Sequence, residues 1–263
     1  MIQVSHLIKR FGPLLAVDDL SFKVEAGELF GFLGPNGAGK TTTINILCTL
    51  LTPTSGQASV AGFDVLQKPY QVRQSIGIIF QDPSLDERLT ALENLHFHAM
   101  LYRIPRLERG NRIQKFLEMM ELWDRRQDLV KTFSGGMKRR LEIARGLLHQ
   151  PKVLFLDEPT IGLDPQTRSH IWRYLFELRQ QEQVTIFLTT HSMEEADRCN
   201  RVAILDRGKM VVLDTPGALK RLTEEPTLES VFLKVTGHEM REEGASSTDQ
   251  LRLVHKKWRG RMR

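Results

Sequence analysis

Hydrophobic and polar residues alternate over the first thirty positions of the chain, as at Ile2 and Val4 and again at Phe22 and Val24. A period of two predicts β-strands with one buried face, and we expect short antiparallel strands here. Further along, short and uniformly apolar runs are typical of strands buried on both faces of a sheet. These runs are Leu29–Leu33, Ala58–Val60, Ile76–Phe80, Val153–Leu156 and Val184–Thr190.

A helical period replaces this pattern elsewhere. After Thr41, apolar residues recur at i, i+3, i+4 and i+7, which predicts an amphipathic helix. Residues 84–150 have a largely helical pattern and interrupt the series of strands, so we expect a helical insertion between two halves of an α/β core. Further helices are predicted around Ile171–Leu178 and over Thr227–Val235, and the polar residues 206–209 predict a hairpin turn.

Composition is that of a globular protein. The chain has 263 residues, of which 41% are hydrophobic and 26% charged. No run approaches the roughly 18 apolar residues of a membrane span, and the first residues lack a signal-peptide pattern. Cys48 and Cys199 are too few and too far apart to indicate a disulfide framework or a metal site, and they fit a reducing compartment.

The net charge of +5 is concentrated at the end of the sequence, because Leu251–Arg263 contains six Lys or Arg residues and no acid. The rest of the chain is nearly neutral, which argues against a dedicated nucleic-acid surface, and we expect no nucleic-acid partner. The predicted organisation is a main domain over 1–220 that contains the insertion at about 84–150. A short helical extension over 221–237 and a flexible basic tail over 238–263 follow it.

The segment Gly34–Thr41 fits the pattern G-x-x-x-x-G-K-[ST], a loop that wraps backbone N–H groups around the phosphates of a nucleotide. It follows a predicted strand and opens a predicted helix, so a bound anion would meet the helix N-terminus. Lys40 would then reach the β- and γ-phosphates, and the Thr41 hydroxyl would bind Mg²⁺. The residues expected to bind the nucleotide here are Gly34, Pro35, Asn36, Gly37, Ala38, Gly39, Lys40, Thr41 and Thr42. The loop indicates ATP or GTP but does not say what the energy is used for.

Three further polar features also come directly after predicted strands. In open α/β sheets, ligands bind beyond the carboxyl ends of parallel strands, so these features are expected to converge on the γ-phosphate. Asp157 suits an indirect Mg²⁺ role, in which a water molecule lies between the carboxylate and the ion, and Glu158 is placed to act as the general base on an attacking water. His191 could orient that water, and Gln81 could join the Mg²⁺ and water shell. Taken singly, Gln81 and His191 would more often be ordinary loop residues.

A second anion site is predicted at Ser134-Gly135-Gly136, where Ser134 is a good N-cap for the helix that follows. Structurally this is simply a capped helix. The site lies on the helical insertion, and one chain is not expected to bring both sites onto the same phosphate. Two copies of the chain arranged head to tail can bring the two sites together, with two nucleotides held between the copies.

With these motifs in order, the sequence resembles the nucleotide-binding subunit of an ATP-binding cassette (ABC) transporter over about residues 2–220. The resemblance implies a P-loop NTPase core, which is a mostly parallel sheet with helices on both faces. It also implies an N-terminal antiparallel β-subdomain and an inserted α-helical subdomain. Within the family, the segments Phe133–Leu141 and His191–Asp197 resemble the ABC-2 type, the daunorubicin-resistance-like branch whose ATPase is separate from its permease.

By this resemblance, Phe11 stacks on adenine in place of the commoner Tyr. The signature motif of the family is Phe133–Met137, in which Met137 replaces the usual Gln at the end. The D-loop has Ile161-Gly162 where Ser-Ala is common. The implied function is an ATPase that powers export through a separate membrane permease, so the protein would lie on the cytoplasmic face of the cell membrane. ATP and Mg²⁺ would be its cofactors, and a second copy of the chain would be its partner.

Two other functions fit less well. A soluble ABC-type ATPase that acts on ribosomes or DNA usually carries two cassettes or long coiled-coil insertions, whereas this chain has one cassette and no sustained heptads. A regulatory nucleotide-binding module without hydrolysis is disfavoured because Glu158 and His191 are both present.

Overall fold

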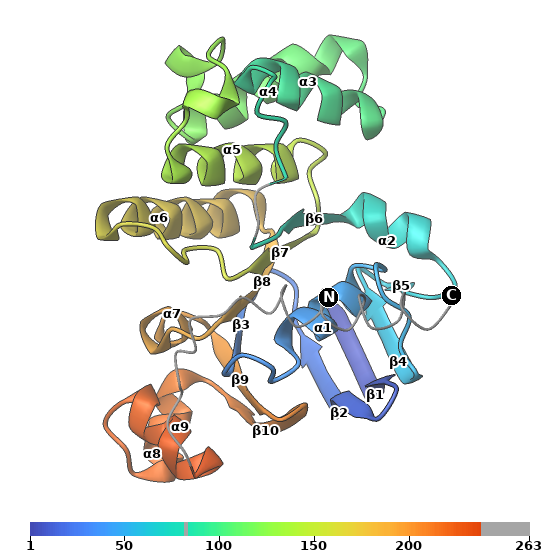
Figure 1. Ribbon diagram of the computed structural model, residues 1–263, viewed down its shortest axis with the longest axis vertical. Coiled ribbons are helices and arrows are strands. Elements are labelled where there is room, and N and C mark those ends of the chain that lie inside the picture. The colour runs from blue at the N-terminus through green and yellow to red at the C-terminus, as the bar shows by residue number, and fades with distance from the viewer. Residues whose placement is uncertain (82–83, 238–263) are drawn as a thin grey trace, which may run out of the picture.

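Two β-sheets and a set of helices make up the computed structural model, which describes residues 1–81 and 84–237 (Figure 1). The larger sheet has the strand order β10-β9-β3-β8-β7-β6. Every neighbouring pair in it is parallel except β9 and β10, which form the predicted hairpin. Its strands are β3 (Leu29–Leu33), β6 (Ile76–Ile79), β7 (Val153–Asp157), β8 (Thr185–Thr190), β9 (Arg201–Asp206) and β10 (Lys209–Asp214).

The second sheet is antiparallel, as the alternating pattern predicts, and has the order β2-β1-β4-β5. Its strands are β1 (Ile2–Phe11), β2 (Leu14–Val24), β4 (Ser55–Val60) and β5 (Phe63–Asp64). Together the two sheets confirm the expected fold class, a mostly parallel α/β core with an N-terminal antiparallel sheet.

The larger sheet is buried on both faces because its central strands are uniformly apolar. Every residue of β3 and β7 is buried. Phe30 and Phe32 point from β3 toward the antiparallel sheet, where their rings meet those of Phe22 and Phe187 with centroids 5.1 to 5.7 Å apart. Helix α1 (Lys40–Leu47) contributes to the same core. Residues such as Leu29 and Leu33 point to the opposite face, into a second core formed with the remaining helices.

The chain between β6 and β7 forms the helices at one end of the molecule, where the insertion was predicted (Figure 1). Helix α3 begins only after Thr90, whose side chain forms a capping box with Glu93, so the start of the insertion is not helical. The helices of this region are α3 (Ala91–Leu101), α4 (Arg106–Met119) and α5 (Gly135–Leu147), with short 3₁₀ turns η1 (Trp123–Arg125) and η2 (Val130–Thr132). Helix α2 (Pro69–Ser75) precedes β6.

The remaining helices are α6 (Pro165–Glu182), α7 (Met193–Asp197), α8 (Pro216–Thr223) and α9 (Leu228–Thr236). Helix α9 confirms the helix predicted over Thr227–Val235, and it buries Leu228, Val231 and Phe232. Helices α8 and α9 pack together, and α9 also packs against α7. Helix α8 spans residue 220, where the end of the main domain is predicted. The predicted tail over 238–263 lies outside the described residues. None of the helices described is long and apolar enough to cross a bilayer.

Candidate functional site

The four polar features lie at one edge of the larger sheet. Strands β3, β8, β7 and β6 are consecutive and parallel, so their carboxyl ends point the same way. The predicted convergence of these strand ends is therefore confirmed. Lys40, Asp157, Glu158 and His191 form a cluster at this edge, whereas the side chain of Gln81 makes no hydrogen bond to it in the described part of the chain.

The glycine loop joins β3 to α1, and two of its glycines leave no room for a side chain. Gly39 adopts φ of +97°, and a Cβ on it would lie 2.5 Å from the Ala16 carbonyl oxygen. A Cβ on Gly34 would lie 2.6 Å from the carbonyl oxygen of Leu205. The loop is therefore packed against β2 and β9, and its path delivers the chain to the first turn of α1, where backbone N–H groups lack acceptors within the helix.

Lys40 is the first residue of α1 and is buried. Its Nζ donates to the carbonyl oxygens of Gly34 at 2.7 Å and Pro35 at 3.1 Å, and lies 3.5 Å from Oε1 of Glu158. Burial lowers the pKa of Lys40, an effect that the nearby carboxylates of Glu158 and Asp157 oppose. The loop thus holds a desolvated cation beside an acid, in a position where phosphate oxygens could replace the loop carbonyls as its partners.

Asp157 is the last residue of β7, and its side chain is also buried. The Thr41 hydroxyl donates to Oδ1 of Asp157 at 3.4 Å, and the Thr189 hydroxyl donates to the same oxygen. Burial raises the pKa of Asp157, and these two hydrogen bonds oppose the rise. Sequence reasoning missed Thr189. Its position two residues before His191, at the end of a buried strand, is the one signal that could have indicated it.

Glu158 has a left-handed backbone, with φ of 48°. Its N–H donates to the carbonyl oxygen of Thr189 at 3.2 Å and to the Thr189 hydroxyl at 3.1 Å. Its Oε1 lies 3.3 Å from Nδ1 of His191, in addition to its contact with Lys40. The strand end and the turn therefore aim this carboxylate at the loop.

The charged groups of this cluster shift one another's pKa values. Burial alone would raise the pKa of Glu158, but the hydrogen bond from His191 and the charge of Lys40 outweigh burial and hold it below its ordinary value. The hydrogen bond to Glu158 in turn raises the pKa of His191, although partial burial opposes this. At neutral pH the carboxyl group of Glu158 is ionised and can accept a proton.

Gln81 and Phe11 lie outside this buried cluster. Gln81 is exposed two residues beyond β6, and its side chain makes no hydrogen bond to the described residues of the cluster. Phe11 ends β1 with 36% of its surface exposed, and Nζ of Lys9 lies 5.0 Å from the ring centroid. The roles expected of both residues stay predictions.

Ser134 is the N-cap of α5, as predicted, and its hydroxyl accepts a hydrogen bond from the backbone N–H of Met137 at 3.2 Å. A Cβ on Gly135 would meet nothing within 4 Å, whereas one on Gly136 would lie 2.5 Å from Cγ2 of Thr167. In the described part of the chain, no hydrogen bond joins Ser134–Gly136 to the glycine loop. Helices α5 and α1 lie in different parts of the molecule (Figure 1).

Sequence reasoning also missed Glu195, a buried acid on α7. Its Oε2 accepts a hydrogen bond from the hydroxyl of Thr190 at 2.6 Å, and its Oε1 accepts one from the hydroxyl of Thr160. Glu195 therefore joins the end of β8 to the segment after Glu158. The sequence signal was its position three residues after Ser192, the N-cap of α7.

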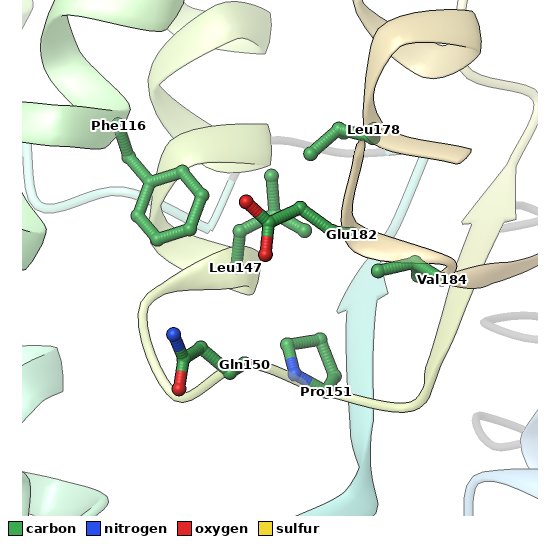
Figure 2. A pocket seen from close by; sticks show the side chains of 7 residues that line it. All are labelled: Phe116, Leu147, Gln150, Pro151, Leu178, Glu182 and Val184. Carbon is green, nitrogen blue, oxygen red and sulfur yellow. The ribbon is translucent and has the colours of Figure 1, made fainter. Parts of the chain in front are cut away.

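A small cavity of about 60 Å³ lies away from this site. Val184 and Pro151 stand just before β8 and β7, so the cavity is at the amino ends of the strands. Figure 2 shows the Phe116 ring and the Glu182 carboxylate facing the same space. The other lining residues are Leu147, Gln150 and Leu178. Ligand sites usually measure roughly 300 Å³ or more, so this cavity is too small for a nucleotide.

The described residues contain no group of three or more His, Cys, Asp or Glu side chains that could hold a metal ion. A Mg²⁺ ion does not need one, because it is usually held by one or two protein oxygens together with substrate phosphates and water. The hydroxyl of Thr41 and the carboxylate of Asp157, 3.4 Å apart, form such a pair of oxygen donors.

A protein-family model described as "ABC transporter" matches residues 17–161. Among curated proteins, the chain is 38% identical over 240 residues to the probable multidrug ABC transporter ATP-binding protein YbhF of Escherichia coli K12, with 89% of the chain covered. It spans only 41% of that relative's length. It is 40% identical to the linearmycin resistance ATP-binding protein LnrL of Bacillus subtilis, over 82% of the chain and 69% of that protein. It is 43% identical to the daunorubicin/doxorubicin resistance ATP-binding protein DrrA of Streptomyces peucetius, over 83% of the chain and 66% of that protein.

Comparison with solved structures points to the same family. The structure of an ATP-binding subunit of an ABC transporter has a TM-score of 0.81 and 29% identity, covering 90% of this chain and 99% of that one. An ATP-binding cassette solved as a dimer in a post-hydrolysis state with ADP and phosphate has a TM-score of 0.74 and 28% identity. It covers 82% of this chain and 98% of that one. The resemblance inferred from the motifs is thereby confirmed.

Proposed function

Because this chain belongs to the ABC transporter family, we propose that it binds ATP at Gly34–Thr41 and hydrolyses it with Glu158 as the general base. One observation carries the proposal: Glu158 Oε1 contacts both Lys40 and His191, at 3.5 and 3.3 Å. A lysine for the phosphates, an ionised carboxylate for the water and a histidine beside it form a set of groups that can carry out phosphoryl transfer to water.

Each group has a role that its surroundings support. Lys40 would bind the β- and γ-phosphates, exchanging its bonds to the loop carbonyls for bonds to phosphate oxygens. Glu158 would take a proton from the attacking water, and its lowered pKa keeps it ionised for this step. His191, whose pKa is raised, would hold Glu158 and the γ-phosphate in place.

Thr41 and Asp157 fit a Mg²⁺ site, because their hard oxygen donors already lie together at the edge of the phosphate loop. Bound there, Mg²⁺ would neutralise charge on the β- and γ-phosphates. Gln81 is proposed to join the same shell of ligands and water. Phe11 is proposed to stack on adenine, and its partly exposed ring is consistent with that role.

A second copy of the chain would complete the site. The open surface over Gly135 and the free face of Ser134 suit the phosphates of a nucleotide bound to a partner chain. No hydrogen bond joins the glycine loop to this motif within the described part of the chain, which supports a head-to-tail arrangement. Loss of the γ-phosphate on hydrolysis would then release the two copies from each other.

We further propose that this ATPase powers export through a separate ABC-2 type permease, on the cytoplasmic face of the cell membrane. The names of LnrL and DrrA, both resistance proteins, support export, and so do the ABC-2 features of the motifs. A role on ribosomes or DNA has less support, because the helices between β6 and β7 are short and form no long coiled coil.

Two experiments test the proposal: an ATPase assay of a Glu158 variant and the identification of the protein's binding partner. Glu158→Gln should retain ATP binding and abolish steady-state hydrolysis, measured with the purified full chain, because the amide cannot accept the proton. Undiminished hydrolysis would remove Glu158 from the mechanism. Affinity purification of the tagged chain from membranes should yield a polytopic protein, and recovery with ribosomes instead would overturn the transport proposal.

A further inference from the structure

Helix α5 carries a buried cation that neither the sequence motifs nor the proposed mechanism uses. Arg139 lies in the second turn of this helix, five residues after the N-cap Ser134, and only 6% of its surface is exposed. Burying a guanidinium is costly unless its donors are satisfied, so the acceptors that it has found are informative.

Those acceptors are backbone carbonyl groups around the catalytic carboxylate. Nε of Arg139 donates to the carbonyl oxygen of Pro159 at 2.8 Å. Nη2 donates to the carbonyl oxygens of Asp157 at 3.2 Å and Glu158 at 3.4 Å. Three successive carbonyl groups of one turn therefore converge on one guanidinium, whose planar fork suits several acceptors at once.

The other arm of the guanidinium reaches the end of a different strand. Nη1 of Arg139 donates to the carbonyl oxygen of Phe80 and lies 3.3 Å from Oε2 of Glu142. Glu142 is itself buried, and its Oε1 accepts a hydrogen bond from the backbone N–H of Ser84 at 2.8 Å. The pair thus binds α5 both to the segment after β7 and to the segment after β6.

The peptide group between Asp157 and Glu158 is consequently held at both ends. Arg139 binds its carbonyl oxygen, and Thr189 binds its N–H from the opposite side. Glu158 needs this support, because a non-glycine residue with φ of 48° keeps that conformation only where its surroundings impose it.

We propose that Arg139 is a positioning residue that fixes the backbone of Glu158 and so links the signature helix α5 to the general base. The proposal rests on the proposed function, because it needs Glu158 to act in hydrolysis. It goes beyond the motifs, which assign no role to Arg139 or to its buried partner Glu142.

The test compares two neighbouring arginines of the same helix. Arg139→Lys keeps the positive charge beside Glu142 but cannot span the carbonyls of both segments. Arg140→Lys is the matched control, because Arg140 Nη1 donates to the Met120 carbonyl oxygen at 2.9 Å and stays within the helical region. Steady-state ATPase kinetics and ATP binding by the full chain are measured for both.

We expect Arg139→Lys to lower kcat by about 10- to 100-fold, since a misplacement of roughly 1 Å at a catalytic group costs up to about that much. Its Kd for ATP should stay close to the wild-type value, because the phosphate loop is untouched. Arg140→Lys should keep both constants. An unchanged kcat in folded Arg139→Lys would overturn the proposal, and so would a parallel loss of kcat and ATP affinity or an equal loss in the control.

If Arg139→Lys does not fold, the double variant Arg139→Met/Glu142→Met replaces the buried pair with apolar side chains of similar length, an exchange that proteins often tolerate. The same fall in kcat with retained ATP binding is expected, and wild-type kcat in this variant would refute the idea. Glu158→Gln separates the two proposals. If that variant still hydrolyses ATP, the assignment of Glu158 fails, whereas an inactive Glu158→Gln beside a fully active Arg139→Lys defeats only the role of Arg139.

Discussion

The hydrogen bond from Thr189 to Asp157 should be measurable as stability, and Thr189→Val isolates it. Thr189 is fully buried, and valine has nearly the same shape, so the substitution opens no cavity. The hydroxyl donates to Oδ1 of Asp157 and accepts from the backbone N–H of Glu158 at 3.1 Å. The N–H keeps a second acceptor in the Thr189 carbonyl at 3.2 Å, so the main loss is the hydrogen bond to a buried carboxylate.

A hydrogen bond to a charged group contributes about 1.5–3 kcal/mol, so we expect the free energy of unfolding to fall by about 2 kcal/mol at neutral pH. For a chain of this size that corresponds to a fall in Tm of roughly 4–8 °C. The assay is thermal unfolding followed by circular dichroism, with urea unfolding as a second measure.

The effect should depend on pH in a definite direction. Burial already raises the pKa of Asp157 in the folded protein, and the Thr189 hydrogen bond opposes that rise. Without this hydrogen bond the folded pKa rises further. The penalty is therefore fully present above both folded pKa values and is lost as the pH falls through them, because the protonated acid needs the bond less.

Thr185→Val is the matched control on the same strand. Thr185 is equally buried, but its hydroxyl accepts from the neutral N–H of Gly27 at 3.0 Å, so its loss should cost about 1 kcal/mol with no dependence on pH. A Thr189→Val protein as stable as the wild type would refute the reasoning, as would a penalty that does not change with pH.

Three further outcomes are expected. Lys40→Ala should lose ATP affinity in a direct binding titration, because the buried cation for the phosphates is gone; unchanged affinity would contradict the role of the loop. An NMR titration of His191 should give a pKa above its ordinary value, and Glu158→Gln should lower it, since the hydrogen bond that His191 donates to Glu158 is the main cause of the shift. Gly39→Ala should unfold at a lower temperature than the wild type, because a Cβ would lie 2.5 Å from the Ala16 carbonyl oxygen in a left-handed residue. A Tm equal to that of the wild type would show that the loop can shift to accept it.

Much of the site could be predicted because its chemistry is local. The pattern of Gly34–Thr41 carries the loop, the helix start and the lysine in eight consecutive residues. Ser134 could be identified as an N-cap for the same reason, and the structure confirms it. Asp157, Glu158 and His191 follow apolar runs, and the rule that parallel strands end at one edge was enough to bring them together.

Arg139, Thr189 and Glu195 escaped prediction because each has at least one partner that lies 18 or more residues away in the sequence. The positions of Thr189 before His191 and of Glu195 after Ser192 are the local signals, and neither identifies the side chain that each residue binds. Arg139 has no such local signal. Arg139 binds carbonyl groups about 20 residues ahead of it and about 60 residues behind it. Only the packing of α5 against the ends of β6 and β7 brings these acceptors within reach.

The sequence by itself determined which groups are the candidates for nucleotide binding and hydrolysis and the order of strands and helices that carries them, because short-range spacing and periodicity specify both. The tertiary structure alone decided how those groups act on one another. It buried Lys40 beside Glu158, held Glu158 in a left-handed turn between Arg139 and Thr189, and left the described Ser134–Gly136 without a hydrogen bond to the phosphate loop. The reason is physical: distances between side chains and the cost of burying their charges exist only once the sheets and helices have packed.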